Sequence, residues 1–328
     1  MSGNEFNGIT YFLKGKRSFC AALLTMIFLL TTSIAVYAEP VAAFAGGNGT
    51  ELDPYRVATA EQLNNVRYHL DKHFKQTANI DMNVAPYNTD LGWEPIGSYG
   101  SPFNGTFDGN GKTISNLTIN RSARDVGLFG VTGLSAEIKN VKLENANVNG
   151  SQSTGALVGR NGGTIINSYV TGTVAGYYDE IGGLVGYNHE GTITNSYATG
   201  AVTGTKNIGG LVAFTNYGTA SNSYWDTTTS GTVSSAGGEG KTTAQMKQQA
   251  TFANWDFTDI WNIEGSRNGG YPFLKGNPPH PDADAVYADR DALTWDSIKG
   301  GNSTPDNITN NLTNPLPTAG DRKSTRLN

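Results

Sequence analysis

The chain of 328 residues is poor in several features that common fold classes need. Charged residues make up only 16%, against a usual share of ~25%. The 42 glycines disfavour a helical bundle or coiled coil, because glycine destabilises helix interiors. The net charge of −5 offers no polybasic surface, so we expect no nucleic-acid partner. A β-rich chain with many turns is the class that remains.

Cysteine is absent apart from Cys20, and long apolar runs are absent apart from one near the N-terminus. Three basic residues between positions 14 and 17 precede that run, which extends from Phe19 to Val36. Val36-Tyr37-Ala38 then supplies small residues at the usual cleavage positions. Residues 1–38 are therefore predicted to be a secretory signal peptide, with a transmembrane anchor as the alternative. Cleavage would leave a secreted chain with no cysteine and no membrane span.

The middle of the chain contains a repeat of about 27 residues. Each repeat carries a phrase related to Gly-Gly-Leu-Val-Gly, and its leucines recur at intervals of 29, 27 and 27 residues: Leu128, Leu157, Leu184 and Leu211. A second phrase carries asparagines at intervals of 27, 28 and 27 residues: Asn140, Asn167, Asn195 and Asn222. Such regularity over a hundred residues indicates repeating structural units.

Each repeat holds three short β-prone pieces with no helical periodicity. Pieces this short bury an apolar face only when stacked, so we predict an all-β fold, a right-handed parallel β-helix or solenoid with short helical caps. The leucines would line its core, and the asparagine amides would bond from layer to layer. Glycines flanking the Leu-Val pairs would permit corners with positive φ. A β-propeller needs ~40–45 residues per blade, which is too long for this period.

One stretch of the repeat resembles a known family. Gly-Gly-Leu-Val-Gly-x-Asn-x-x-Gly-Thr-Ile-x-Asn-Ser-Tyr-x-Thr-Gly, from Gly182 to Gly200, resembles the GLUG motif. Flanking segments such as Phe103–Ile119 and Gly270–Leu274 resemble those that usually open and close GLUG coils, so the likeness covers about residues 44–275. The resemblance implies a bacterial surface or secreted protein, with repeats similar to the non-catalytic region of IgA-specific metallopeptidases.

These observations predict four segments. Residues 39–276 would form the solenoid, with core repeats at about 124–226, a capping helix at 59–71 and a second helix at 243–250. Residues 277–286 would be a proline-rich linker. Residues 287–328 resemble the opening of an atrophied bacterial immunoglobulin-like domain, and we expect this domain to be truncated, with its last residues foreign to the natural chain.

No catalytic motif is assembled in the sequence. His69 and His73 have the spacing of a zinc site on the expected helix, but Leu70 occupies the place of the glutamate that a metalloprotease needs. Scattered acids such as Asp179 and Glu180 do not form a recognisable pair. We therefore expect no enzyme activity, no cofactor and no metal in this chain.

A row of aromatic residues supplies the candidate binding site. Tyrosines recur at one position of the repeat, with a tryptophan beside the last: Tyr169, Tyr197, Tyr224 and Trp225. Facing outward, they would form a platform for sugar rings; the alternative is that they pack at a corner and stabilise the stacking. The sequence thus predicts a secreted or cell-surface scaffold or adhesion module that binds an extracellular glycan or a surface protein. The alternative function is the non-catalytic N-terminal part of a larger extracellular peptidase or polysaccharide-degrading enzyme.

Overall fold

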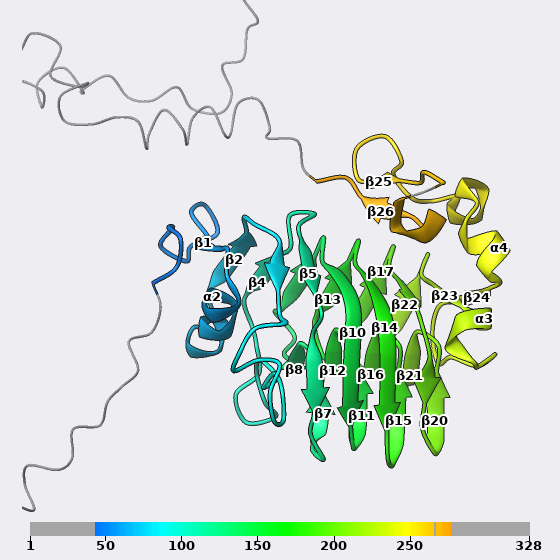
Figure 1. The fold of residues 1–328 in the computed structure, drawn as a ribbon, viewed down its shortest axis with the longest axis horizontal. Helices are drawn as coiled ribbons and strands as arrows, with labels where there is room; N and C mark the ends of the chain where they lie inside the picture. Colours follow the sequence, from blue (N-terminus) through cyan, green and yellow to red (C-terminus); the bar gives the residue numbers. More distant parts are fainter. Residues whose placement is uncertain (1–42, 266, 277–328) are drawn as a thin grey trace, which may run out of the picture.

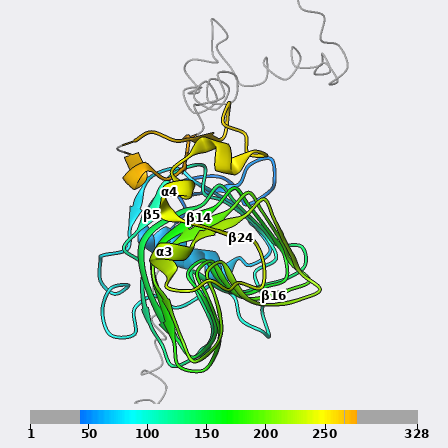
Figure 2. The same ribbon diagram turned by 90° about the vertical axis from the view of Figure 1, so that its right-hand side faces the viewer.

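The computed structural model describes residues 43–265 and 267–276, which form a solenoid of parallel β-strands (Figure 1). Four successive coils run from Arg124 to Asp226 and superpose when viewed along the solenoid axis (Figure 2). The predicted all-β parallel solenoid is confirmed. The predicted signal peptide, linker and immunoglobulin-like segment lie outside the described residues.

Each coil contributes one strand to each of four sheets, so the expected three pieces per repeat are in fact four. The first sheet consists of β1 (Tyr55–Val57), β2 (His73–Gln76), β4 (Thr106–Asp108), β9 (Glu137–Lys139), β13 (Thr164–Ile166), β17 (Thr192–Thr194) and β22 (Thr219–Ser221). The second sheet consists of β3 (Ile80–Asp81), β5 (Thr113–Ser115), β10 (Lys142–Gly150), β14 (Tyr169–Gly176), β18 (Tyr197–Thr199), β23 (Tyr224–Asp226) and β24 (Glu239–Lys241). Two further strands pair with this sheet, β6 (Thr118–Asn120) and β19 (Val202–Thr203).

The third and fourth sheets flank the Leu-Val phrase of each coil. The third sheet consists of β7 (Arg124–Val126), β11 (Gln152–Gly155), β15 (Asp179–Gly182) and β20 (Lys206–Gly209). The fourth consists of β8 (Phe129–Thr132), β12 (Val158–Asn161), β16 (Val185–His189) and β21 (Val212–Asn216). The short β25 (Trp261–Asn262) and β26 (Phe273–Leu274) form an antiparallel pair after the coils.

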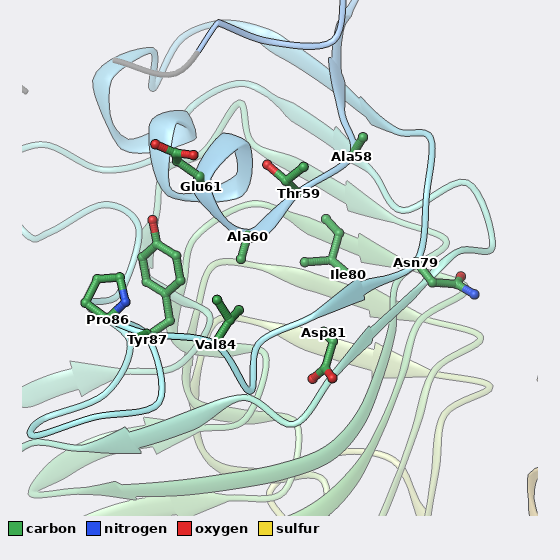
Figure 3. Close-up of a pocket in the computed structure, with 11 residues that line it drawn as sticks. Ala58, Thr59, Ala60, Glu61, Asn79, Ile80, Asp81, Val84, Pro86 and Tyr87 are labelled. Atoms are coloured by element: carbon green, nitrogen blue, oxygen red, sulfur yellow. The ribbon is translucent and has the colours of Figure 1, made fainter. Parts of the chain in front are cut away.

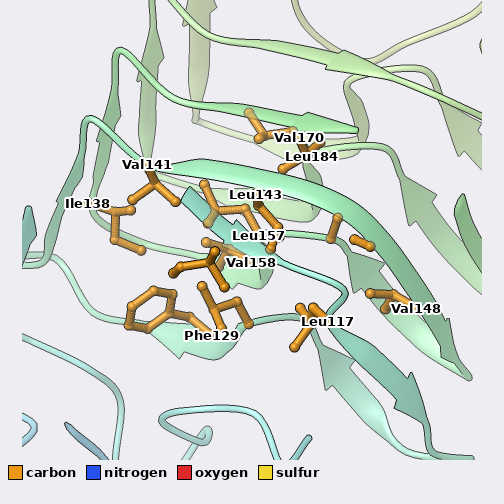
Figure 4. Close-up of a cluster of buried hydrophobic side chains, with 14 of the residues drawn as sticks. Leu117, Phe129, Ile138, Val141, Leu143, Val148, Leu157, Val158, Val170 and Leu184 are labelled. Carbon is orange, nitrogen blue, oxygen red and sulfur yellow. The ribbon is translucent and has the colours of Figure 1, made fainter. Parts of the chain in front are cut away.

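The core is built from identical positions in successive coils. The four motif leucines are fully buried. Val158 follows Leu157 directly and is also fully buried. Both belong to one buried cluster: Leu157 lies beside Leu143, and Val158 lies beside Phe129, its register partner one coil earlier (Figure 4). The Leu-Val phrase therefore crosses the interior of the coil.

The flanking glycines do not have the expected positive φ. Left-handed backbone occurs instead at the repeated asparagines, with φ between 47° and 54°. The glycines are needed for close approach: a Cβ on Gly159 would lie 2.3 Å from the carbonyl carbon of Asp125, and one on Gly186 would lie 2.4 Å from that of Ser153. Absence of a side chain, rather than backbone freedom, explains these glycines.

The asparagine row lies at a corner of the coils and extends beyond the four repeats. Asn195 Nδ2 donates to Asn167 Oδ1 at 3.3 Å. Asn140 Nδ2 donates to Asp108 Oδ1 at 2.9 Å, one coil earlier. Asn222 Oδ1 accepts from Asn254 Nδ2 at 2.9 Å, beyond the last coil. These residues adopt a left-handed backbone conformation, which asparagine tolerates better than most residues. Their side chains also form layer-to-layer hydrogen bonds.

Short helices lie at both ends of the coils. The N-terminal helix α2 (Ala60–Asn65) begins after Thr59, whose side chain accepts from Gln62 N at 3.2 Å. A 3₁₀ turn follows (Val66–Tyr68), so the α-helix is shorter than the expected 59–71. At the other end lie α3 (Thr227–Ser230), α4 (Thr243–Met246) and two 3₁₀ turns, Gln249–Phe252 and Arg267–Gly270.

Candidate functional site: two aromatic rows and a groove

The predicted tyrosine platform is not open to solvent. Tyr169 and Tyr197 stack with ring centroids 5.0 Å apart, and both are buried, as is Tyr224. They are covered by residues 246–265 and 267–274, hereafter the cover, a segment that lies over the coils in Figure 2. Its Trp255 and Trp261 pack against the tyrosine rings. A sugar ring has no access to these faces, so the outward-facing platform is wrong, and the alternative of packed tyrosines holds for all three.

Trp225 is buried on a different side from the tyrosines. It belongs to the apolar core of the solenoid, whereas the tyrosines cluster with the cover. A Cβ on Gly210 would lie 1.9 Å from Trp225 Cδ1, so the indole occupies the space that a side chain there would need. Trp225 therefore closes the core and does not extend the tyrosine row.

Hydrogen bonds hold the cover to the tyrosine row. Tyr197 Oη donates to the Pro272 carbonyl at 2.6 Å and accepts from Asn268 Nδ2 at 2.7 Å. Tyr169 Oη donates to the carboxylate of Glu144. Burial raises the pKa of both tyrosines well above the usual value, so their hydroxyls stay protonated.

Asp226 joins the last coil to the cover. Its carboxylate accepts from Thr243 Oγ1 and from Tyr271 Oη, each at 2.6 Å, and from the backbone N–H groups of Thr228 and Thr229. Burial by itself would raise the pKa of Asp226, but these hydrogen bonds outweigh it and lower the pKa below the usual value. Burial and the bond to Asp226 raise the pKa of Tyr271 to about 12.

A second row of flat side chains lies on the fourth sheet, with Tyr99 of the loop before β4 beside it, and stays accessible. The guanidinium of Arg160 lies 5.3 Å from the ring of Tyr99 and 4.7 Å from that of Tyr187. The rings of Tyr187 and Phe214 are 5.4 Å apart. Tyr99 is 75% exposed and Phe214 39% exposed. We call Tyr99, Arg160, Tyr187 and Phe214 the open stack.

Sequence reasoning missed the open stack, although the repeat carried a signal for it. Arg160, Tyr187 and Phe214 each stand three residues after a motif leucine and pair in register through β12, β16 and β21. Only two of the three are aromatic, so the position does not show as an aromatic repeat. Recognising it requires knowing that this position faces outward.

The third sheet supplies the polar side chains that face the open stack. Asp125, Ser153, Glu180 and Asn207 take equivalent places in successive coils, with φ between 47° and 64°. Ser153 Oγ donates to the carboxylate of Glu180. Burial raises the pKa of Asp125, while Arg124 and Arg160 act to lower it, which places Arg160 near this carboxylate. The Ser153 side chain also acts on this carboxylate to lower its pKa, and Asp125 Oδ1 is shielded from solvent.

The two sheets approach each other closely at Gly159, which lies against the backbone of Asp125, and at Gly186, which lies against that of Ser153. At the last coil a cavity of about 490 Å³ lies between β20 and β21, lined by residues that include Lys206, Asn207 and Phe214. This volume is within the range of ~300–1,000 Å³ typical of small-ligand sites. We call the space between the open stack and the polar row the groove.

A second cavity of about 520 Å³ lies near the N-terminal end, between α2 and the loop after β3 (Figure 3). Glu61 lies on its helix side and Asp81 on its strand side (Figure 3). Asp81 is held by hydrogen bonds from Asn116 Nδ2 at 2.8 Å and Asn83 N at 2.9 Å, which lower its pKa. This carboxylate is therefore already engaged in holding the local structure.

The other acids and histidines considered from the sequence are dispersed. His69 follows the 3₁₀ turn and packs against Phe44 and Tyr55, whereas His73 is in β2, so the two do not share a helix face. Asp179 forms an ion pair with Lys206 at 3.0 Å. In the portion of the chain that the structure describes, no group of three or more His, Cys, Asp or Glu side chains is placed to hold a metal ion.

No helix in the described portion of the chain combines the length and the apolar character that crossing a membrane would require.

Comparison with known proteins identifies the repeats. The chain is 42% identical over 147 residues to Halomucin of Haloquadratum walsbyi, covering 43% of this chain and 2% of that protein. It is 37% identical over 157 residues to the "Putative Gly-rich membrane protein" of Evansella cellulosilytica, covering 46% of this chain and 18% of that protein. The chain thus spans less than a fifth of the length of either relative.

Among solved structures, the crystal structure of a "putative immunoglobulin A1 protease" from Bacteroides ovatus is similar to 71% of this chain and 96% of its own, with 20% identity and a TM-score of 0.49. The GLUG motif family matches residues 150–175 and 179–203. The first match contains β11 to β13 and all of β14 but its last residue, and the second contains β15 to β19. Two successive coils of the solenoid are therefore GLUG motifs.

Proposed function

We propose that this chain is a secreted or cell-surface scaffold whose solenoid serves adhesion. The observation that carries the proposal is the open stack, a row of accessible side chains that the repeat sets at coil spacing on an otherwise well-packed fold. Support comes from the predicted signal peptide and from the relative named as a Gly-rich membrane protein.

The mechanism is geometric. Parallel strands lie ~4.7–4.9 Å apart, so equivalent side chains of neighbouring coils are presented at that interval on a rigid surface. Contacts that are weak individually then act together on an extended partner, because each bound unit raises the effective concentration of the next. Such binding needs no catalytic group.

A cysteine-labelling experiment tests the surface location. Cys20 is the sole cysteine of the chain and lies within the predicted signal peptide. Val233→Cys, at a position 88% exposed, introduces a reporter for a membrane-impermeant maleimide applied to intact bacteria that produce the full chain. We expect labelling on intact cells or in the culture medium.

Ser168→Cys is the matched control, because Ser168 is buried in a serine row of the coils. It should be labelled only after denaturation. Labelling of Val233→Cys that appears only after cell lysis would contradict the proposed function.

A further inference from the structure

We propose that the groove binds a neutral polysaccharide chain lying along the solenoid axis. This inference deepens the adhesion proposal and rests on it. It moves the glycan site from the covered tyrosine row to the open stack and the polar row that faces it.

The two walls of the groove match the two surfaces of a sugar ring. A pyranose presents C–H groups on its faces, which pack against flat aromatic rings, and hydroxyls around its edge. Phe214 and Tyr99 offer exposed parts of their rings, whereas Arg160 lies over the ring of Tyr187. Across the groove, the Glu180 carboxylate supplies an acceptor, and Asn207, whose Nδ2 donates to Asp179 Oδ1 at 2.8 Å, supplies its amide oxygen and its second N–H.

The wall that carries the rings also supplies hydrogen-bond donors, because the guanidinium of Arg160 lies between two of its rings. Arg160, near Asp125 and stacked between Tyr99 and Tyr187, adds donors for ring and hydroxyl oxygens.

The charges of the walls favour a neutral ligand over an acidic one. The cations are Arg124, Arg160 and Lys206, and the carboxylates are Asp125, Asp179 and Glu180. The numbers balance, and Lys206 is already paired with Asp179. An acidic polysaccharide would meet as much repulsion as attraction, so charge gives it no advantage.

The repeat of the groove also suits a polymer. Positions on neighbouring coils are separated by the ~4.7–4.9 Å strand spacing, which is close to the length of one sugar residue in an extended chain. A polysaccharide along the axis would therefore place successive sugars on successive coils, at Arg160, Tyr187 and Phe214. The cavity at the last coil would hold the sugar at the end of the groove.

Affinity electrophoresis of the full chain tests the inference. Native gels each contain one polysaccharide: galactomannan, laminarin or dextran as neutral probes, and polygalacturonate or hyaluronate as acidic probes. We expect at least one neutral polysaccharide to retard the protein and the acidic ones to leave its mobility unchanged. The double variant Tyr187→Ala/Phe214→Ala should weaken the retardation about tenfold or more on a dissociation-constant scale.

Two single variants keep the test independent of folding. Tyr99→Ala removes a 75% exposed ring of the open stack and should weaken binding severalfold with unchanged thermal stability. Tyr68→Ala removes a similarly exposed ring, 61% exposed, in the 3₁₀ turn after α2, which contributes no residue to the groove, and should leave binding unchanged.

Three outcomes would overturn the inference: no retardation by any neutral polysaccharide, retardation by acidic polysaccharides only, or equal retardation of the wild type and the groove variants. If Val233→Cys is labelled at the surface and any of these results is obtained, the polysaccharide site is excluded while the surface-scaffold proposal is retained. Absence of surface labelling would remove the scaffold proposal itself.

Discussion

The two aromatic rows of this solenoid arise from the same repeat, but one is buried and the other is accessible to solvent. Tyr169, Tyr197 and Tyr224 lie on the second sheet, where the cover buries them. Tyr187 and Phe214 lie on the fourth sheet, and among the described residues no segment equivalent to the cover packs over them. The repeat places side chains in rows, but a neighbouring segment decides whether a row becomes core or surface.

The comparison also separates two uses of aromatic stacking. In the covered row, the phenol hydroxyls are paired with protein groups such as Pro272 O and the Glu144 carboxylate. In the open stack, the guanidinium of Arg160 lies between the rings of Tyr99 and Tyr187, and Tyr187 packs on Phe214. The first arrangement stabilises the fold, and the second leaves ring faces available to a ligand.

The largest expected effect is in the covered row. Tyr197→Ala should lower the free energy of unfolding by about 3–5 kcal/mol, as for other buried aromatic residues, because it leaves a cavity between the solenoid and the cover. Urea unfolding followed by tryptophan fluorescence measures it, since Trp255 and Trp261 pack on this ring. A loss below about 1 kcal/mol would show that the cover does not pack on the tyrosines in solution.

The link between coil and cover should respond to pH. Asp226 has a pKa below the ~3.9 of an unfolded chain, so its contribution is present at higher pH and is lost as pH falls from about 5 towards 2. Asp226→Asn should cost roughly 1.5–3 kcal/mol at pH 7, because charged hydrogen bonds to Thr243 and Tyr271 are lost.

The variant should also lose part of this acid dependence. Urea titrations at pH 7, 4 and 2.5 compare its unfolding free energy with that of the wild type. A difference that stays constant across this range would rule out the Asp226 carboxylate as the pH-sensitive link.

The asparagines at the coil corner have two roles, a left-handed backbone conformation and a layer-to-layer hydrogen bond, and variants of Asn195 separate them. Both Asn195→Ala and Asn195→Gly remove the hydrogen bond to Asn167, but only glycine accepts the left-handed φ of 48° without strain. We expect the alanine variant to be less stable than the glycine variant by about 1–2 kcal/mol. Equal stabilities of the two variants in thermal unfolding would mean that alanine adopts the left-handed conformation at this position without strain.

The smallest expected effect on stability is in the open stack. Tyr187→Ala should change the free energy of unfolding by less than about 1 kcal/mol, because the ring is half-buried and its neighbours Arg160 and Phe214 remain solvated. Chemical denaturation beside Tyr197→Ala measures the contrast directly. Similar losses of unfolding free energy in Tyr187→Ala and Tyr197→Ala would contradict the division into a structural row and an accessible row.

Much of the fold was predictable because its signal is periodic. The intervals of about 27 residues placed Leu157 and Leu184 in the core and Asn167 and Asn195 at one corner, as the structure shows. The role of the glycines was not predictable in detail. Sequence pattern shows that position 159 recurs as glycine, but only the packing shows that Asp125 of the preceding coil excludes a side chain there.

The sequence by itself determined the solenoid, because a repeated phrase that cannot bury its apolar face alone must stack on its copies. Only the tertiary structure decided which aromatic row is accessible. Tyr197 bonds to Pro272, 75 residues later, in a segment with no counterpart among the repeats. A periodic pattern specifies contacts between coils, but it holds no information about a non-repeating segment that folds back over one sheet and leaves another open.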